Sequence, residues 1–214
     1  MIDPIAVGLA AAATVAGYLV GSISSGYLVG RAYRYVDLRT VGSGSTGATN
    51  MLRTLGPGAA LLVALLDILK GAAAVFIAAR VVGGASDLLP IAQAAAATGA
   101  VAGHCWPAFL EGRGGRGVAT AFGAFLFIAT PAWFLAVVSF ALAVALTRII
   151  SVGSLASVAG GVIGYIVLAA AGVLPFHWAV LAFVLTAGGI IVWRHRPNIE
   201  RLMRGVEPRR GSRA

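Results

Sequence analysis

The segment Gly117–Leu146, which reads GVATAFGAFLFIATPAWFLAVVSFALAVAL, gives the clearest indication of the architecture of this chain. It runs for thirty residues without a charged side chain, whereas a helix that crosses a bilayer needs only about 20 residues. Thr130 and Pro131 lie near its middle, and a proline inside a helix removes a backbone hydrogen bond and breaks the helix. The stretch therefore predicts two short membrane spans with a tight turn between them.

The composition of the whole chain agrees with a membrane protein. Of its 214 residues, 59% are apolar and only 11% are charged, whereas a soluble domain carries about 25% charged residues. So few charges cannot cover a protein surface in water, which excludes a soluble globular enzyme, and the high apolar content excludes disorder. The single cysteine, Cys105, excludes an intrachain disulfide.

Further apolar runs on both sides of the central stretch predict five more spans. These are Ile5–Val29, Gly58–Val82, Leu88–Leu110, Gly153–Ala171 and Phe176–Trp193. The predicted fold class is thus an all-α polytopic membrane protein with seven transmembrane helices, some of them short, and glycine-rich cytoplasmic loops. We expect one membrane domain over residues 1–204 and a basic, disordered tail over residues 205–214.

The distribution of basic residues predicts the orientation of the chain. There are 16 Lys+Arg against 7 Asp+Glu, and 14 of the 16 basic residues lie in the first, third and fifth loops or in the tail. Cytoplasmic loops are the ones rich in Lys and Arg, so we expect the amino terminus outside and the carboxyl terminus in the cytoplasm. The net charge of +9 is divided among short loops without a basic and aromatic surface, so no nucleic-acid partner is expected.

A first polar cluster lies in the first loop, in the segment VGSGSTGATN at 41–50, and Arg53 follows it. Glycines let a backbone approach a ligand closely, and successive N–H groups and hydroxyls can surround an anion. Arg53 can add a two-pronged contact to a phosphate. The alternative is a flexible loop with an arginine at the membrane interface.

A second cluster, EGRGGRGVAT at 111–120, connects the third span to the short fourth span. Gly114, Gly115, Arg116 and Gly117 precede a predicted helix start, and helix N termini bind anions. The alternative is an ordinary basic cytoplasmic loop. His104 lies just before this loop, where a histidine is more often a packed residue than a catalytic base.

Two further clusters lie near the carboxyl-terminal spans. Ser154 stands at the entrance of the sixth span, where the ordinary explanation is a helix cap. His195 and Asn198 follow the last span at i, i+3 spacing, and Pro197 indicates that a new helix begins there. Basic residues that mark the cytoplasmic end of the last span account for the neighbouring arginines. They do not account for His195 and Asn198.

One pair of charges, Asp67 and Lys70, lies inside the second predicted span. Charges within a membrane are costly and usually face the interior of a helix bundle. At i, i+3 spacing the two charges can neutralise each other, which would make them a structural pair. A contact of these residues with substrate is an equally good explanation.

With these motifs in this order, the sequence resembles the bacterial acyl-phosphate:glycerol-3-phosphate acyltransferases, the PlsY family. The resemblance extends over nearly the whole chain. It rests on the segments GSISSGY at 21–27, GSG at 42–44, GATNxxR at 47–53, DxxKG at 67–71, GH at 103–104, GGRGVAT at 114–120, SLAS at 154–157 and RHRxNI at 194–199. The chain departs from the usual family pattern at two positions, with Ser45 in place of Asn and Arg116 in place of Lys.

The resemblance implies a seven-helix enzyme of the bacterial cytoplasmic membrane. It implies transfer of a fatty acyl group from acyl phosphate to the 1-hydroxyl of glycerol 3-phosphate, which yields lysophosphatidic acid and phosphate. The implied catalytic residues are His195, Asn198 and Ser154. The implied substrate-binding residues are Ser43, Ser45, Asn50, Arg53, Arg116, Gly114, Gly115 and Gly117. Besides the two substrates and membrane lipid, no cofactor, metal or obligate protein partner is expected.

Two mechanisms and one different function stay open at this point. An acyl phosphate is already activated, so positioning and charge stabilisation suffice, and a phosphate oxygen of the substrate can accept the hydroxyl proton. His195 is the alternative base, and Glu200 five residues later makes a near match to the His-x4-Asp motif of other acyltransferases. A transporter or anion channel is the competing function, because transporters also contain broken spans. Its weakness is that the polar clusters gather on one predicted side.

Overall fold

The computed structural model describes residues 3–83 and 87–209. Within those residues the backbone forms ten α-helices and one 3-10 helix, and no strand. The chain divides into two compact units, residues 1–128 and 129–214, each of which we describe by itself. The boundary lies at Ala129, at the proline-marked break inside the segment Gly117–Leu146.

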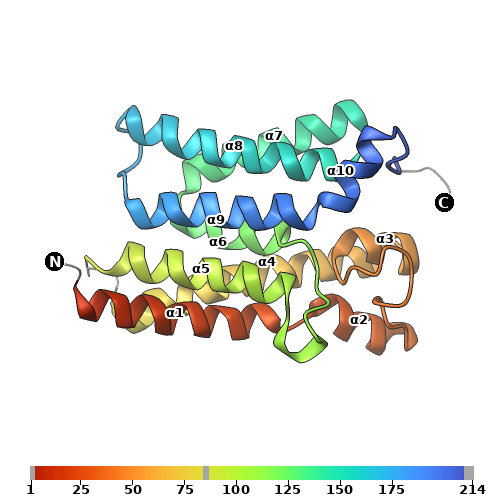
Figure 1. Ribbon diagram of the computed structural model, residues 1–214, viewed down its shortest axis with the longest axis horizontal. Helices are drawn as coiled ribbons and strands as arrows, with labels where there is room; N and C mark the ends of the chain where they lie inside the picture. The colour runs from red at the N-terminus through yellow and green to blue at the C-terminus, as the bar shows by residue number, and fades with distance from the viewer. Residues whose placement is uncertain (1–2, 84–86, 210–214) are drawn as a thin grey trace. The chain divides into compact units, whose positions relative to one another are not determined.

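The first unit contains six α-helices and the 3-10 helix. They are α1 (Pro4–Ser22), α2 (Ser25–Arg34), α3 (Ala48–Leu55), α4 (Pro57–Val82), α5 (Leu89–Cys105), η1 (Ala108–Leu110) and α6 (Val118–Ile128). Helices α1 and α5 lie side by side (Figure 1). A Cβ atom on Gly17 of α1 would collide with the Ala96 carbonyl, and one on Gly99 of α5 would collide with the Thr14 carbonyl. Small residues thus allow the two backbones to touch, as is usual between membrane helices.

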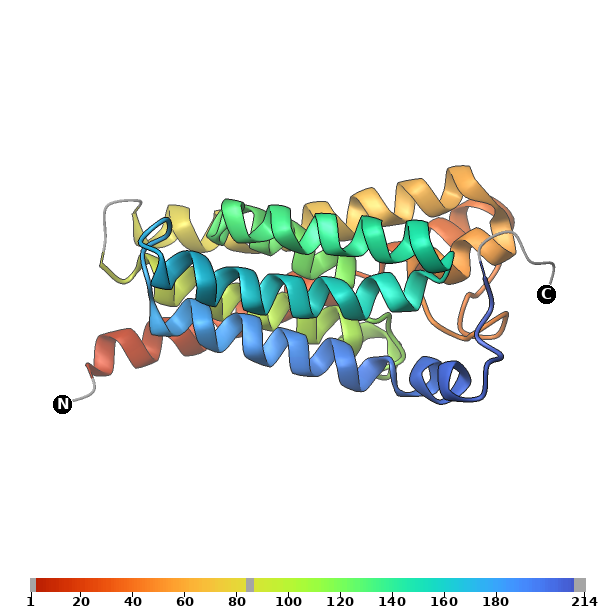
Figure 2. The same cartoon turned by 90° about the horizontal axis from the view of Figure 1, so that it is seen from above.

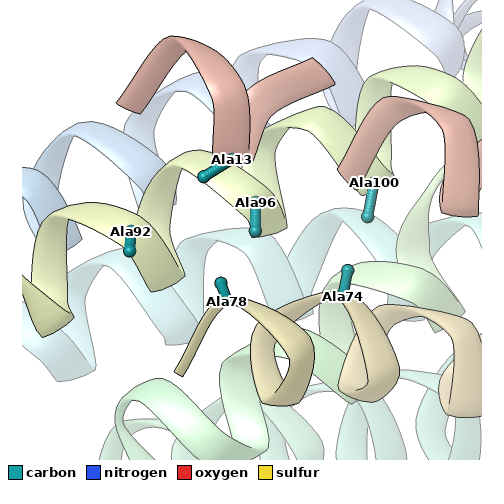
Figure 3. Packing of buried hydrophobic residues seen from close by; sticks show 6 residues of the cluster. All are labelled: Ala13, Ala74, Ala78, Ala92, Ala96 and Ala100. Carbon is teal, nitrogen blue, oxygen red and sulfur yellow. The ribbon is translucent and has the colours of Figure 1, made fainter. Parts of the chain in front are cut away.

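The core of the first unit is built largely from alanine. One cluster joins α1, α4 and α5, and consists of Ala13, Ala74, Ala78, Ala92, Ala96 and Ala100 (Figure 3). A second cluster, which includes Leu38, Met51 and Val63, joins α3 and α4 to the loop that follows α2. Leu38, Met51 and Val63 have no exposed surface. This second cluster fixes the base of the first polar loop.

The second unit contains four α-helices, α7 (Thr130–Thr147), α8 (Ile150–Ala170), α9 (Trp178–Arg194) and α10 (Arg196–Met203). Helix α8 packs between α7 and α9 (Figure 2). Gly153 and Gly160 of α8 lie against side chains of α7, where a Cβ atom would not fit. Helices α9 and α10 are bent by 58° at His195.

The break at Thr130–Pro131 is confirmed. Helix α6 ends at Ile128, Ala129 leaves the helical conformation with φ −151° and ψ 67°, and Pro131 lies in the first turn of α7. A proline is tolerated there because the N–H group it lacks would have no partner within the helix. Pro197 likewise lies in the first turn of α10, which confirms that a new helix begins after His195.

The span predicted at Ile5–Val29 corresponds to the candidate span Pro4–Arg34, but the backbone breaks within it, between α1 and α2. Ile23 and Ser24 are extended, with ψ angles of 104° and 95°. The carbonyl of Ile23 accepts a hydrogen bond from the ammonium group of Lys70, 2.9 Å away. A side chain from α4 thus stabilises a break that no proline marks.

Helical length and composition support a membrane protein. In the part of the chain that the structure describes, four segments are long and apolar enough to cross a bilayer: Pro4–Arg34, Pro57–Val82, Thr130–Thr147 and Ile150–Ala170. The bent pair α9–α10 makes a fifth if it counts as one span. Large apolar side chains such as Leu61, Leu69 and Phe76 stand exposed on α4. Such a surface suits contact with lipid, since soluble proteins rarely expose large apolar patches.

Candidate functional site

The first polar loop folds around the side chain of Asn50. The Asn50 amide group lies 3.0 Å from the carbonyl oxygen of Val41, 2.9 Å from that of Ser45 and 3.2 Å from that of Leu38, and it donates to all three. Its side-chain oxygen accepts from the N–H of Ser43, 3.0 Å away. Asn50 is 2% exposed. The hydrogen bonds of Asn50 therefore hold the loop in shape.

The loop around Asn50 requires glycine and leaves its hydroxyls near the surface. Gly42 has a φ of 58°, and a Cβ atom there would collide with the side-chain oxygen of Asn50. Ser43 is exposed and Ser45 is partly buried. Arg53, in the last turn of α3, is also exposed. One short segment therefore contains Ser43, Ser45 and Arg53. The side chain of Asn50 holds the backbone of its loop through hydrogen bonds.

A charged pair stands at the entrance to this loop. Arg39 donates to both carboxylate oxygens of Asp37, the shortest contact being 2.7 Å, and its guanidinium lies over the ring of Tyr27. The hydrogen bond from Arg39 lowers the pKa of the Asp37 carboxyl below its ordinary value. The Asp37 carboxylate therefore keeps its charge and remains paired with Arg39.

The glycine-rich loop lies against the end of α5. The N–H of Gly115 donates to the carbonyl of His104, 3.0 Å away, and a Cβ atom on Gly115 would collide with the His104 ring. Gly114 is buried against the same carbonyl. Gly117 has a φ of 87°, and α6 begins directly after it. Arg116 is partly buried, so the loop places one arginine beside the first turn of a helix.

His104 belongs to a buried group of charges. Its Nδ1 atom lies 3.4 Å from a carboxylate oxygen of Asp67, and the same oxygen lies 2.8 Å from the ammonium nitrogen of Lys70. The side chains of Asp67, Lys70 and His104 are 1%, 7% and 5% exposed. The expectation that Asp67 and Lys70 face the interior is confirmed. His104 is a packed residue, and its place in the sequence did not indicate its contact with Asp67.

Helix α1 also anchors the segment that leads into the glycine-rich loop. The hydroxyl of Tyr18 donates to the carbonyl of Trp106, 2.8 Å away. The N–H of Ala108 donates to the hydroxyl of Ser22, at 3.2 Å. Figure 1 shows this segment turning back beside the end of α1. Tyr18 and Ser22 lie in a predicted span, so position along the sequence alone gave no sign of this role.

In the second unit, Ser154 does not cap its helix. Helix α8 begins at Ile150, and its N-cap residue, Ile149, has no side-chain cap. The ordinary explanation for Ser154 is therefore wrong, because it lies a full turn inside the helix. Its hydroxyl donates to the carbonyl of Ile150, 3.1 Å away, and the residue is 5% exposed.

His195 and Asn198 lie at the bend between α9 and α10, and each is 1% exposed. The Nδ1 atom of His195 lies 2.7 Å from the carbonyl oxygen of Ile191. A carbonyl can only accept, so Nδ1 carries the proton, and in the neutral ring Nε2 holds the lone pair. Glu200 is exposed on α10. The exposed position of Glu200 therefore gives no support to a match with the His-x4-Asp motif.

Glu207 organises the polar residues of the second unit. Its carboxylate accepts from the Asn198 amide at 2.6 Å, from the Ser151 hydroxyl at 2.7 Å and from the Arg201 guanidinium at 2.7 Å. Burial raises the pKa of Glu207, but these three hydrogen bonds outweigh it, so its pKa lies below the ordinary value.

Glu207 lies in the segment expected to be disordered, and it is only 7% exposed. It is the single acidic residue after Glu200, and it stands in a tail rich in arginine. This isolated acidic residue could have indicated a structural role for the tail. Residues 210–214 of that tail lie outside the described part of the chain.

The orientation of Asn198 follows from its bond to Glu207. A carboxylate accepts hydrogen bonds, so the nitrogen of the Asn198 amide must point toward it. Its oxygen, Oδ1, is then buried and, among the described residues, has no hydrogen-bond donor. A buried acceptor without a donor is costly, so this oxygen is suited to receive a hydrogen bond from a ligand.

The structure thus assembles the predicted residues in two groups. The group in residues 1–128 comprises Ser43, Ser45, Asn50, Arg53, Gly114, Gly115, Arg116 and Gly117. The group in residues 129–214 comprises Ser154, His195 and Asn198. Across the described ranges 3–83 and 87–209, no cluster of three His, Cys, Asp or Glu side chains could hold a metal ion.

Comparison with known proteins gives a consistent result. A family model described as glycerol-3-phosphate acyltransferase matches residues 11–205. A protein of that name from Gloeobacter violaceus is 42% identical over 211 residues, which cover 99% of this chain and 98% of the relative. A second, from Parasynechococcus marenigrum, is 43% identical over 207 residues, which cover 92% of this chain and 88% of the relative.

Solved structures agree with the sequence comparisons. The glycerol 3-phosphate form of PlsY (YgiH), an integral membrane glycerol 3-phosphate acyltransferase, matches with a TM-score of 0.80 at 34% identity. The match covers 97% of this chain and 96% of that one. The lysophosphatidic acid form matches with a TM-score of 0.77 at 32% identity.

Proposed function

Because this chain belongs to the glycerol-3-phosphate acyltransferase family, we propose that it transfers a fatty acyl group from acyl phosphate to the 1-hydroxyl of glycerol 3-phosphate. The products are lysophosphatidic acid and inorganic phosphate. The observation that carries the proposal is the family match over residues 11–205, which includes every residue assigned to the site below. The known forms of PlsY, with glycerol 3-phosphate and with lysophosphatidic acid, agree with this substrate and this product.

Phosphate binding is assigned to the first group of residues. Arg53 and Arg116 supply positive charge, and the N–H groups at the start of α6 point toward the glycine-rich loop. Gly114, Gly115 and Gly117 let an anion approach the backbone closely. Ser43 and Ser45 offer hydroxyls, and Asn50 holds their loop in shape.

Acyl transfer forms one carbon–oxygen bond and breaks another. The 1-hydroxyl oxygen attacks the acyl carbonyl carbon, and the bond from that carbon to the phosphate oxygen breaks. The hydroxyl proton passes to a phosphate oxygen of the substrate or to Nε2 of His195, and phosphate leaves with the bonding electron pair. Because the leaving group is already good, no covalent enzyme intermediate is needed. Positioning and charge stabilisation then supply the rate enhancement.

The second group of residues is assigned to the acyl-transfer step. Oδ1 of Asn198 can accept a hydrogen bond from the substrate hydroxyl, since it has no donor among the described residues. Nε2 of His195 is an acceptor in the neutral ring. Ser154 lies one turn along α8 from Ser151, which shares the Glu207 carboxylate with Asn198.

One assay tests the proposed function against its alternative. Purified protein in detergent receives acyl phosphate and glycerol 3-phosphate, and phosphate release is measured. Release that depends on both substrates supports the acyltransferase, while substrate uptake into liposomes without release supports a transporter. The assay is repeated after treatment with a chelator, and we expect the activity to persist. Loss of activity with rescue by a divalent cation would contradict the metal-free mechanism.

We further propose that the protein resides in the bacterial cytoplasmic membrane with seven spans. The amino terminus then lies outside, and the carboxyl terminus and both groups of site residues face the cytoplasm, where glycerol 3-phosphate is available. The excess of Lys and Arg in alternate loops supports this orientation. No obligate protein partner is needed for the proposed chemistry.

A further inference from the structure

The buried charges of Asp67 and Lys70, with the His104 ring beside them, take no part in the proposed chemistry, yet they are costly to keep inside a membrane helix bundle. Their side chains are at most 7% exposed. An isolated ion pair such as Asp67–Lys70 would need no third partner. The third partner, His104, is the residue on which the glycine-rich loop rests. Because His104 contacts both Asp67 and the glycine-rich loop, we expect the charged pair to do more than neutralise itself.

The His104 ring connects the buried charges to the loop. Nδ1 faces the carboxylate of Asp67 at 3.4 Å. The opposite edge of the ring, at Nε2, lies so close to Gly115 that a Cβ atom there would collide with it. The His104 carbonyl accepts the N–H of Gly115, at 3.0 Å. The side chain and backbone of one residue thus set where Gly115 lies.

The same network reaches the neighbouring elements. Lys70 donates to the carbonyl of Ile23, at 2.9 Å, and so ties α4 to the break between α1 and α2. Gly71, the next residue, has no room for a Cβ atom because the carbonyl of Thr120 in α6 lies against it. Asp67 and Lys70 therefore lie where α4 meets the break after α1, the end of α5 and the start of α6.

We infer that Asp67 and His104 are positioning residues that hold the glycine-rich loop, Gly114–Gly117, in its phosphate-binding conformation. The inference rests on the proposed function of that loop. Asp67 orients the His104 ring, the ring supports Gly115, and Lys70 compensates the charge of the carboxylate. None of the three touches the substrate. A displacement of the loop by about 1 Å can lower activity by up to roughly a hundredfold.

The experiment must separate positioning from simple stabilisation. The double variant Asp67→Leu/Lys70→Met removes both charges together, so no unpaired charge remains, and such replacements of buried ion pairs are often neutral for stability. If the pair only neutralises itself, the variant keeps the KM values of the unmodified protein. If Asp67 orients His104, the variant folds, but the KM for glycerol 3-phosphate or for acyl phosphate rises roughly tenfold.

A second variant and a control complete the test. His104→Ala changes no buried formal charge if His104 is neutral, and we expect the same KM to rise as in the double variant. Thr98→Val lies on the same helix and removes only a hydrogen bond to Ala94, so it should keep both KM values. The thermal unfolding midpoint of each purified variant is measured alongside.

Three results would overturn the inference. The first is a folded double variant with unchanged KM values, and the second is a His104→Ala variant with unchanged KM values. The third is the failure of both variants to fold, which would make the network purely structural. If the unmodified protein releases no phosphate, the proposed function fails instead. Titration with inorganic phosphate then still tests the network, since its affinity for the unmodified protein should exceed that for both variants.

Discussion

The chemistry assigned to His195 depends on which of its ring nitrogens carries the proton. Nδ1 lies 2.7 Å from the Ile191 carbonyl, and this contact holds the ring in one tautomer and one orientation. In serine hydrolases a carboxylate performs this orienting task, whereas here a backbone carbonyl of α9 performs it. A carbonyl stabilises a protonated ring less than a carboxylate does, which suits a residue that binds or accepts a proton transiently.

Replacement of His195 should therefore impair turnover more than folding. We expect His195→Ala to lower kcat by roughly a hundredfold or more, the usual range for a positioned acid or base. His177→Ala is the matched control, because His177 caps the other end of α9 through the N–H of Ala179. The control should lose about 1 kcal/mol of stability and keep its kcat. Near-normal turnover of folded His195→Ala would remove this histidine from the site.

Arg53 should act on binding rather than on turnover. It is exposed, at the end of the short helix that follows the Asn50 loop, where it can reach an anion. We expect Arg53→Ala to raise the KM for glycerol 3-phosphate by roughly tenfold, since a charge-assisted hydrogen bond contributes about 1.5–3 kcal/mol. Arg34→Ala, an exposed arginine in the last turn of α2, is the control and should leave this KM unchanged. Equal effects of the two variants would indicate a general charge effect.

At the scale of elements, Glu207 joins the start of α8, the short helix α10 and the segment that follows it. We expect Glu207→Gln to destabilise the protein by about 1–3 kcal/mol, because a buried hydrogen-bonded carboxylate loses its charge and one acceptor site. Glu200→Gln on the exposed face of α10 is the matched control. The thermal unfolding midpoint in detergent measures the difference, and equal midpoints for the two variants would contradict a structural role for Glu207.

The pH dependence of this contribution has a defined sign. The pKa of Glu207 lies below its ordinary value of 4.5 in the folded protein. Its stabilising contribution is therefore fully present above pH 4.5 and is lost as the pH falls through the lower, folded pKa. The midpoints of the unmodified protein and of Glu207→Gln should thus differ near neutral pH and approach each other in acid. A constant gap down to about pH 3 would show that the carboxylate charge is not responsible.

The sequence predicts those helix boundaries that local chemistry determines. Pro131 and Pro197 begin helices, as their fixed backbone angle predicts. The break at Ile23 and Ser24 was not predicted, because its cause is an ammonium group on α4 that satisfies the Ile23 carbonyl. Sequence periodicity reports on local structure, and it cannot report a hydrogen bond from a distant helix.

The candidate site shows the same division between local and distant causes. The small residues and arginines of the two loops, and the pair at His195 and Asn198, are visible as motifs. The contact of His104 with Asp67 and the contacts of Glu207 arise only when separate helices pack. Asn50 was expected to bind substrate, and its four hydrogen bonds within the loop became apparent only with the backbone in place.

At the scale of the whole molecule, the orientation in the membrane is the prediction that the function depends on. The loop around Val173 contains no basic residue, whereas Arg148 occupies the turn between α7 and α8. Both positions are exposed and both lie in the second unit. The positive-inside rule then places Val173 outside the cell and Arg148 in the cytoplasm.

Cysteine labelling in intact cells tests this orientation. The only native thiol, Cys105, is buried, so the unmodified protein provides a low background. We expect Val173→Cys to react with a membrane-impermeant maleimide in intact cells, because its thiol faces the outside. Arg148→Cys should react only after the membrane is permeabilised. The reverse pattern would place the site residues on the face without glycerol 3-phosphate, and the proposed acyltransferase could not work in that orientation. Labelling of both variants in intact cells would contradict a single fixed topology.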